Sequence, residues 1–116
     1  IDIGVAMTKL YYDLKHHTGV IVGHNLKFDE NIILSELYRC GMNNVIDEFK
    51  KKRKCCTGYG SEKLVKIELK EGKYKMPSLQ ELYQWCFNEH IDNLHNSKED
   101  VINTAKCYFH IVNKFI

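Results

Sequence analysis

The sequence of 116 residues has a single proline, no low-complexity tract and no strong excess of either charge. The lack of proline-rich or repetitive segments excludes a disordered tail or a linker. No apolar run approaches the ~18 residues of a membrane-spanning helix, and no signal-peptide pattern opens the chain, so we expect no membrane partner. The 17 basic and 15 acidic residues leave a net charge of +2, which by itself does not call for a nucleic-acid partner.

Cysteine is present, but not in a pattern typical of a metal site or a disulfide framework. There are five cysteines, an odd number, and no two of them form a Cys-x-x-Cys pair. Cys55 and Cys56 are adjacent, which is awkward for a simple intrachain disulfide. We therefore expect reduced thiols in an intracellular protein, cytoplasmic or nuclear, with most cysteines serving as small core residues.

Hydrophobic periodicity predicts helices that alternate with short strands. Two helix starts carry cap signals: Ser78 with Glu81 three residues later forms a capping box, and Ser97 is the expected N-cap of the last helix. The expected elements are a helix over 2–16, a buried strand over 20–23, a helix over 29–40, a short helix over 44–52, a strand over 55–57, a hairpin within 64–76 that turns at Glu71-Gly72, a helix after Ser78 and a helix over 98–114.

This order of elements implies an α/β layer architecture. Two short parallel strands and one hairpin are nevertheless too little sheet for such a fold. The chain begins with Ile1 rather than methionine, and helical spacing starts at once with Ile3 and Met7. We therefore expect that the chain is cut from a larger sequence and that further strands lie upstream.

The first candidate for chemistry is the stretch from Gly23 to Asp29, directly after the buried strand. In open α/β sheets, ligands bind at the carboxyl ends of the strands. Asp29 would enter the following helix in its first turn. Taken alone, Asp29 is better explained as an ordinary N-cap or first-turn acid.

The second candidate joins His95, which precedes the last helix, with Asp100 in the first turn of that helix. A loop histidine and a helix-start aspartate can converge, so that the carboxyl group binds a metal ion and the imidazole takes a proton from water. The alternative is again capping, because Ser97-x-x-Asp100 fits a capping box and His95 would then be an incidental loop histidine.

Taken together, the two segments resemble a known family. His24-Asn25-x-x-Phe28-Asp29 and, about seventy residues on, His95-x-x-x-x-Asp100 look like the second and third motifs of the DEDDh 3′→5′ exonucleases, the DnaQ-like or RNase T-like group of the ribonuclease H-like fold. The segments 54–57 and 74–83 are similar to the three-prime repair exonuclease branch of that group. The likeness covers residues from about 20 to about 112, in the family's order.

The resemblance implies a role for each motif residue. Asp29 and Asp100 would be ligands of two divalent ions, Mg²⁺ or Mn²⁺, and His95 would be the general base that deprotonates the attacking water. The pocket for the terminal nucleotide would be lined by Asn25 and Phe28, with His24 beside them. The family's substrate is a nucleic-acid 3′ end, with DNA favoured over RNA here, and its products are nucleoside 5′-monophosphates.

Elementary chemistry agrees with these roles. Hydrolysis of a phosphodiester needs a nucleophile at neutral pH and compensation of the negative charge at phosphorus, and two hard cations about 4 Å apart supply both. Hard cations prefer oxygen ligands, which aspartate provides. A histidine titrates near pH 6.5 when unperturbed and therefore suits proton removal.

One family motif is absent, because no Asp-x-Glu occurs in the chain. We therefore expect residues 1–116 to form one partial exonuclease domain of α/β, ribonuclease H-like fold, whose N-terminal strands come from the same polypeptide or a second chain. Alone, the chain should be inactive and poorly stable; if it is active, Glu30 and Glu99 are the first replacement ligands. A non-catalytic nucleic-acid-binding or protein-interaction module on the same fold is the alternative.

Two further features stay open. The basic run Lys50–Lys54 is compatible with phosphate contacts, with a nuclear-import signal or with a solvated loop cluster. Cys86 and His90 are four residues apart on a predicted helix, but the chain offers no second close pair to complete a zinc site.

Overall fold

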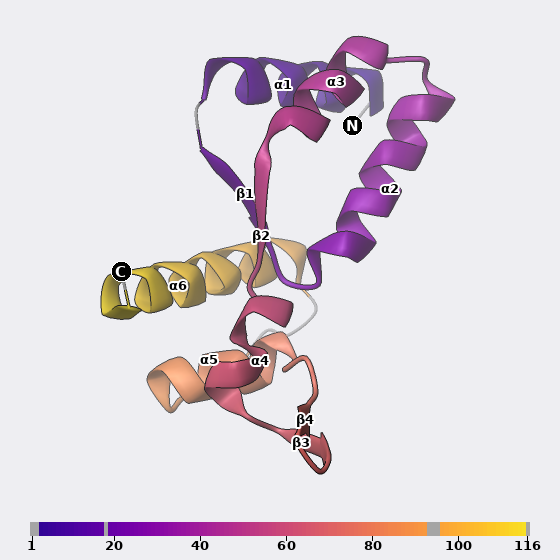
Figure 1. Ribbon diagram of the computed structural model, residues 1–116. Helices are drawn as coiled ribbons and strands as arrows, with labels where there is room; N and C mark the ends of the chain where they lie inside the picture. Colours follow the sequence, from indigo (N-terminus) through magenta and orange to yellow (C-terminus); the bar gives the residue numbers. More distant parts are fainter. Residues whose placement is uncertain (1–2, 18, 93–95, 116) are drawn as a thin grey trace. The chain divides into compact units, whose positions relative to one another are not determined.

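The computed structural model describes residues 3–17, 19–92 and 96–115 (Figure 1). It is a mixed α/β structure, mostly helical, with two small two-stranded sheets. The chain divides into two compact units. Unit 1 combines residues up to Ile21 with Lys27–Lys54, and unit 2 combines Val22–Leu26 with the residues from Cys55 onward.

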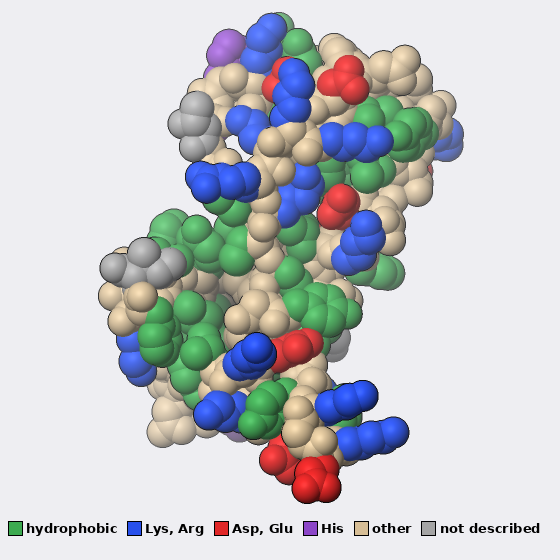
Figure 2. Space-filling view, viewed as in Figure 1, with side chains coloured by type: hydrophobic (Ala, Val, Ile, Leu, Met, Phe, Trp, Pro, Cys, Tyr) green, Lys and Arg blue, Asp and Glu red, His purple; other side chains and the backbone are tan. Residues whose placement is uncertain are grey.

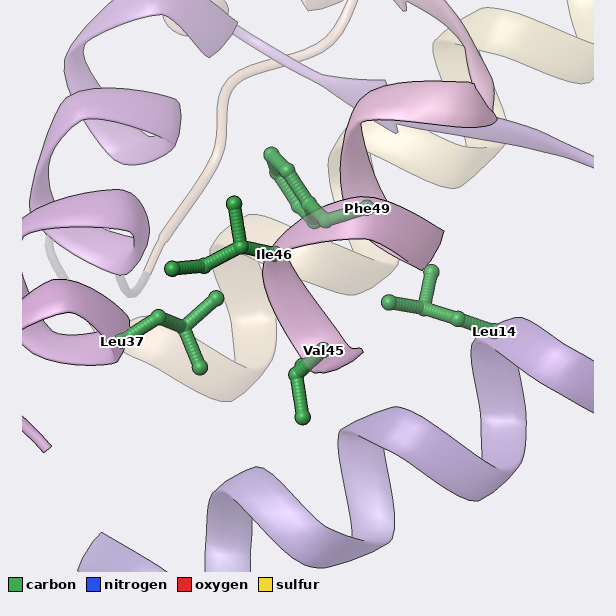
Figure 3. Packing of buried hydrophobic residues seen from close by; sticks show 5 residues of the cluster. All are labelled: Leu14, Leu37, Val45, Ile46 and Phe49. Carbon is green, nitrogen blue, oxygen red and sulfur yellow. The ribbon is translucent and has the colours of Figure 1, made fainter. Parts of the chain in front are cut away.

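Unit 1 is built on three helices, α1 (Ile3–His16), α2 (Leu26–Arg39) and α3 (Asn43–Lys51). Its core joins side chains from all three helices: Leu14, Leu37, Val45, Ile46 and Phe49 (Figure 3). Three of these lie on α3, which therefore presents one apolar face to the other two helices. Complete burial of such a side chain contributes about 1.5–3 kcal/mol, so this face accounts for much of what holds the unit together.

Gly41 separates α2 from α3. Its φ of +67° lies in the left-handed region, where glycine is favoured. The chain reversal lets the Met42 N–H donate to the Leu37 carbonyl at 3.0 Å, which satisfies one of the free carbonyls at the end of α2.

Unit 2 contains the short helices η1 (Tyr59–Ser61) and α4 (Glu62–Val65), the hairpin β3 (Glu68–Lys70) and β4 (Lys73–Tyr74), and the helices α5 (Leu79–Phe87) and α6 (Ser97–Phe115). The strands β3 and β4 are antiparallel and are joined by a turn with Gly72 at φ +76°. Helices α5 and α6 pack on each other around Leu82, Tyr83 and Cys107.

The other sheet pairs β1 (Val20–Gly23) with β2 (Arg53–Cys56). Directly after β2, the Thr57 N–H donates to the carbonyl of Gly23, the last residue of β1, at 2.9 Å. The carboxyl ends of the two strands therefore lie side by side, as in a parallel pair. This edge carries the His24-Asn25 turn.

Most predicted elements are confirmed, with shifted boundaries. Helix α2 begins at Leu26 rather than at residue 29. Asp29 is therefore a first-turn acid, as one alternative predicted, and not the N-cap. The capping box of Ser78 and Glu81 and the hairpin turn at Glu71-Gly72 are confirmed. The helical turns over residues 59–65 were not expected, because Gly58 and Gly60 interrupt any helical pattern there.

The start of α6 corrects one prediction. The side-chain oxygen of Asn96, rather than that of Ser97, accepts the N–H groups of Lys98 at 3.1 Å and Glu99 at 3.2 Å. An Asn side chain one residue upstream reaches the same free N–H groups, so Asn96 is the N-cap.

Some apolar residues of α6 are exposed in the described part of unit 2. Val101 is 70% exposed and Phe109 59% exposed, whereas the buried residues of this helix are Asn103, Thr104 and Cys107. Helix α6 thus faces α5 with its Cys107 side. Among the described residues, no helix is both long and apolar enough to cross a membrane.

Candidate functional site

The His24-Asn25 turn is the best-supported part of the candidate site. A Cβ on Gly23 would lie 2.8 Å from Leu26 Cδ1, so a larger residue there would displace the Leu26 side chain. Asn25 adopts the left-handed conformation at φ +58°, which asparagine tolerates better than most residues. The turn therefore sits at the carboxyl ends of β1 and β2 with an unusual, locally determined backbone.

His24 ties this turn to two distant segments of unit 2. Its Nε2 lies 2.7 Å from the Pro77 carbonyl, and its Nδ1 lies 3.0 Å from Thr57 Oγ1. Because a carbonyl only accepts, Nε2 carries the hydrogen and donates it. Burial lowers the pKa of His24, and the hydrogen bond to Pro77 opposes this in part. With both ring nitrogens used inside the protein, His24 serves to hold the turn.

The two partners of His24 are themselves fixed. Pro77 precedes the capping box of α5, in which Glu81 accepts the Ser78 N–H at 2.9 Å. Lys75 Nζ also lies 2.9 Å from the Glu81 carboxylate and, with the Ser78 N–H, lowers the pKa of that carboxyl group. The Pro77 carbonyl is thus held in place for His24 by the helix start that follows it.

Thr57 and Gly58 pack against the His24-Asn25 turn. The buried Ser61 hydroxyl donates to the Thr57 carbonyl at 2.6 Å and lies 3.0 Å from the Gly58 carbonyl. A Cβ on Gly58 would lie 2.7 Å from Met76 Sδ and 3.4 Å from the Asn25 backbone nitrogen. Any larger residue at position 58 would therefore require the Met76 side chain to move.

Three predicted residues surround the start of α2. Asn25, in unit 2, is half-buried, and its side-chain amide makes no hydrogen bond within the described part of the chain. Phe28 and Asp29 belong to unit 1 and are exposed, Phe28 to 62%. The first-turn position of Asp29 is favoured by the positive end of the helix dipole. All three side chains are available to a ligand.

Asp100, in unit 2, shows the clearest sign of an unmet interaction. It lies in the first turn of α6, and its Oδ1 is buried with no hydrogen-bond partner among the described residues. The capping-box alternative with Ser97 is wrong, because the Asp100 N–H donates to the Asn96 carbonyl at 2.8 Å and Asn96 supplies the cap. The Asp100 side chain is thus not explained by helix capping.

Metal binding by the described residues alone has limited support. His95, the predicted base, lies outside the residues that the structure describes. Within the described ranges, no group of three or more His, Cys, Asp or Glu side chains is arranged to hold a metal ion. The zinc alternative also lacks support, since His90 Nδ1 is hydrogen-bonded to Gln80 and Cys86 packs in the core beside Cys107.

The basic run Lys50–Lys54 is engaged within unit 1. Lys50 Nζ donates to the Tyr38 hydroxyl at 2.9 Å, Lys52 Nζ to the His17 carbonyl, and Lys54 Nζ to the Phe49 carbonyl at 2.9 Å. On the face drawn in Figure 2, lysine and arginine side chains are interspersed with acidic ones and do not merge into one patch. The run is part of a helix end and a strand, so the solvated-loop alternative is wrong.

Comparisons with protein-family models, with curated proteins and with solved structures found no match to this chain. Sequence reasoning singled out His24, Asn25 and Asp100, but it missed the supporting roles of Gly58, Ser61 and Pro77. Their only signal is the run of small residues after β2 and the capping box after Pro77, and neither reveals contacts between distant segments.

Proposed function

We propose that this chain carries part of the site of a metal-dependent 3′→5′ exonuclease of the DEDDh type, on a ribonuclease H-like fold. Such an enzyme would release nucleoside 5′-monophosphates from a nucleic-acid 3′ end, with DNA favoured over RNA. The observation that carries the proposal is the buried Asp100 Oδ1, which has no hydrogen-bond partner in the described part of the chain. An unsatisfied buried polar atom costs about 1–3 kcal/mol, and a cation would remove that cost.

The donor chemistry of Asp100 suits the metal that the proposal requires. Mg²⁺ and Mn²⁺ prefer oxygen ligands, and a carboxyl group supplies both oxygen and negative charge. Asp29, exposed in the first turn of α2, is the second proposed ligand. The chain contains no Asp-x-Glu, so these 116 residues lack the remaining carboxylates of the family's set.

The His24-Asn25 turn supports the same proposal. It lies at the carboxyl ends of two adjacent strands, which is where α/β proteins bind ligands. The contacts of His24 with Thr57 and Pro77 hold the turn in place, while the Asn25 amide makes no hydrogen bond with the residues that the structure describes. Pre-organised polar groups of this kind bind and orient substrates at little entropic cost.

In this proposal each residue has one task. The bound metal ions would stabilise charge at phosphorus and lower the pKa of water. Asp29 and Asp100 would hold the ions, and Asn25 and Phe28 would bind the terminal nucleotide. His95 would accept the proton of the attacking water, as a general base near neutral pH. The five free thiols favour a location inside the cell.

The proposal is tested by nuclease assays on the protein that contains these residues. Asp29→Asn and Asp100→Asn should each remove most of the hydrolysis at saturating Mg²⁺, because each variant loses a charged ligand at nearly unchanged shape. The exposed Asp47→Asn and Asp92→Asn are matched controls and should keep normal rates. Near-normal hydrolysis by either ligand variant contradicts the proposed role. Oligonucleotide binding by the wild type without hydrolysis would favour the non-catalytic alternative.

A further inference from the structure

Unit 2 contains a pocket that the proposed exonuclease site does not use. It is a shallow depression of about 490 Å³ that is widely open to solvent and is lined by Tyr83, Phe87, Glu89, Lys106 and His110. This volume falls within the range of small-molecule sites, about 300–1,000 Å³. None of the five residues belongs to the motifs that carry the proposed nuclease chemistry.

The aromatic wall of the pocket is built on contacts between rings. The rings of Tyr83 and Phe87 are 4.8 Å apart, and the imidazole of His110 meets the edge of Phe87 at 5.1 Å. Tyr83 is 9% exposed and belongs to the core around Leu82, whereas Phe87 is half-buried. A fixed inner ring thus backs a more accessible one, which is a suitable surface for a planar ligand.

The wall that carries Glu89 is also held in place. Asn88 ends α5 in the left-handed conformation at φ +54°, and its side chain accepts a hydrogen bond from Gln84 at 2.9 Å. Beyond Glu89, the Gln80 side chain lies 2.9 Å from His90 Nδ1 and accepts the Ile91 N–H at 3.0 Å. The backbone on both sides of Glu89 is therefore held in place, while the Glu89 side chain is exposed.

The polar side chains that line the pocket make no hydrogen bond or ion pair with one another within the described residues. Lys106 and His110 lie one turn apart on α6, and Glu89 lines the same pocket, yet no ion pair or hydrogen bond joins their side chains there. A complementary ligand has an anionic group for Lys106 and His110, a planar ring for Phe87, and a hydrogen-bond donor for Glu89. A nucleotide has all three: a phosphate, a base, and amino or hydroxyl donors.

We infer that this pocket binds a nucleotide unit without a metal ion, as a second site apart from the proposed catalytic one. The choice of a nucleotide over other aromatic anions rests on the proposed function, whose products are nucleoside 5′-monophosphates. Stacking on an aromatic ring contributes about 1–3 kcal/mol per base, so Phe87 supplies much of the affinity and Lys106 directs the phosphate.

The test is calorimetric titration of the protein that contains these residues with deoxyadenosine 5′-monophosphate in excess EDTA, which removes any metal-dependent site. We expect binding, weakened about tenfold by Lys106→Gln through loss of a charge-assisted hydrogen bond. Lys98→Gln, an exposed lysine on the same helix outside the pocket, should leave the affinity unchanged. Phe87→Leu should weaken binding of the nucleotide but not of deoxyribose 5-phosphate, since only the base stacks.

Other ligands separate the possible outcomes. Tighter binding of a short single-stranded oligonucleotide than of the mononucleotide, with the same loss in Lys106→Gln, would identify the source as a nucleotide within a strand. Absence of nucleotide binding in EDTA, an unchanged affinity in Lys106→Gln, or equal binding of phenylalanine would overturn the inference. The binding tests are done in EDTA, where no hydrolysis occurs, so a negative result there does not contradict the proposed exonuclease activity. Conversely, loss of hydrolysis in the nuclease assays does not contradict nucleotide binding in this pocket.

Discussion

Replacing Asp100 with asparagine should stabilise the metal-free protein. The wild-type Oδ1 is buried without a hydrogen-bond partner among the described residues, although the residue as a whole is only half-buried. An amide oxygen of the same shape is cheaper to bury than a charged carboxyl oxygen. The substitution therefore removes part of a penalty that the folded state carries in the absence of a cation.

Two effects of opposite sign decide the magnitude. Replacing the charged oxygen with an amide oxygen, which still has no partner among the described residues, recovers part of a penalty of about 1–3 kcal/mol. Loss of a negative charge in the first turn of α6 costs about 0.3–1 kcal/mol through the helix dipole. The first effect is larger, so we expect Asp100→Asn to raise the free energy of unfolding by about 1 kcal/mol. For a chain of this length that corresponds to a rise in Tm of about 4 °C.

The measurement is thermal unfolding with EDTA and with Mn²⁺. In EDTA, Asp100→Asn should unfold at a higher temperature than the wild type. The neighbouring Glu99→Gln, which loses the same first-turn charge without burying an unpaired oxygen, should unfold at a lower one. Added Mn²⁺ should stabilise the wild type, by about 2.7 kcal/mol at 100 times the Kd, and should not stabilise Asp100→Asn.

Two results would refute this reasoning. A lower Tm of Asp100→Asn in EDTA would mean that the carboxyl group is satisfied in the folded protein. An equal response of the wild type and the variant to Mn²⁺ would mean that Asp100 does not hold the metal.

Three other perturbations test the site. His24→Ala should destabilise the protein by about 1–3 kcal/mol and should flatten the pH dependence of its stability. The folded pKa of His24 is lowered from 6.5, so its contribution to stability is complete above pH 6.5 and is lost as the pH falls below it. Urea unfolding of the wild type and the variant at pH 7.5 and 5.5 measures this difference. Gly58→Ala should cost about 1–3 kcal/mol because its Cβ would overlap Met76, and Met76→Ala in the same chain should restore part of the Tm. His95→Ala should slow hydrolysis about 10²–10⁴-fold with little change in Mn²⁺ affinity; identical shapes of the two pH–rate profiles would exclude His95 as the base.

Local features of this protein are predictable from its sequence alone. Regular apolar spacing placed the helices, and glycines marked the turn at Gly41 and the hairpin at Gly72. The capping box of Ser78 and Glu81 is readable because all its contacts lie within four residues. Motif spacing likewise predicted His24, Asn25, Asp29 and Asp100 as candidate site residues, since that pattern is a property of the chain alone.

Tertiary structure decided what depends on residues far apart in the chain. The ring of His24 contacts Thr57 and Pro77, which lie 33 and 53 residues away in the chain. No local sequence pattern predicts hydrogen bonds over such distances. The N-cap of α6 is Asn96 rather than the predicted Ser97. Both side chains suit an N-cap, so the sequence does not distinguish them, and the backbone geometry determines which one caps the helix. The unpaired oxygen of Asp100 follows from burial, which depends on how α6 packs and cannot be derived from composition or periodicity.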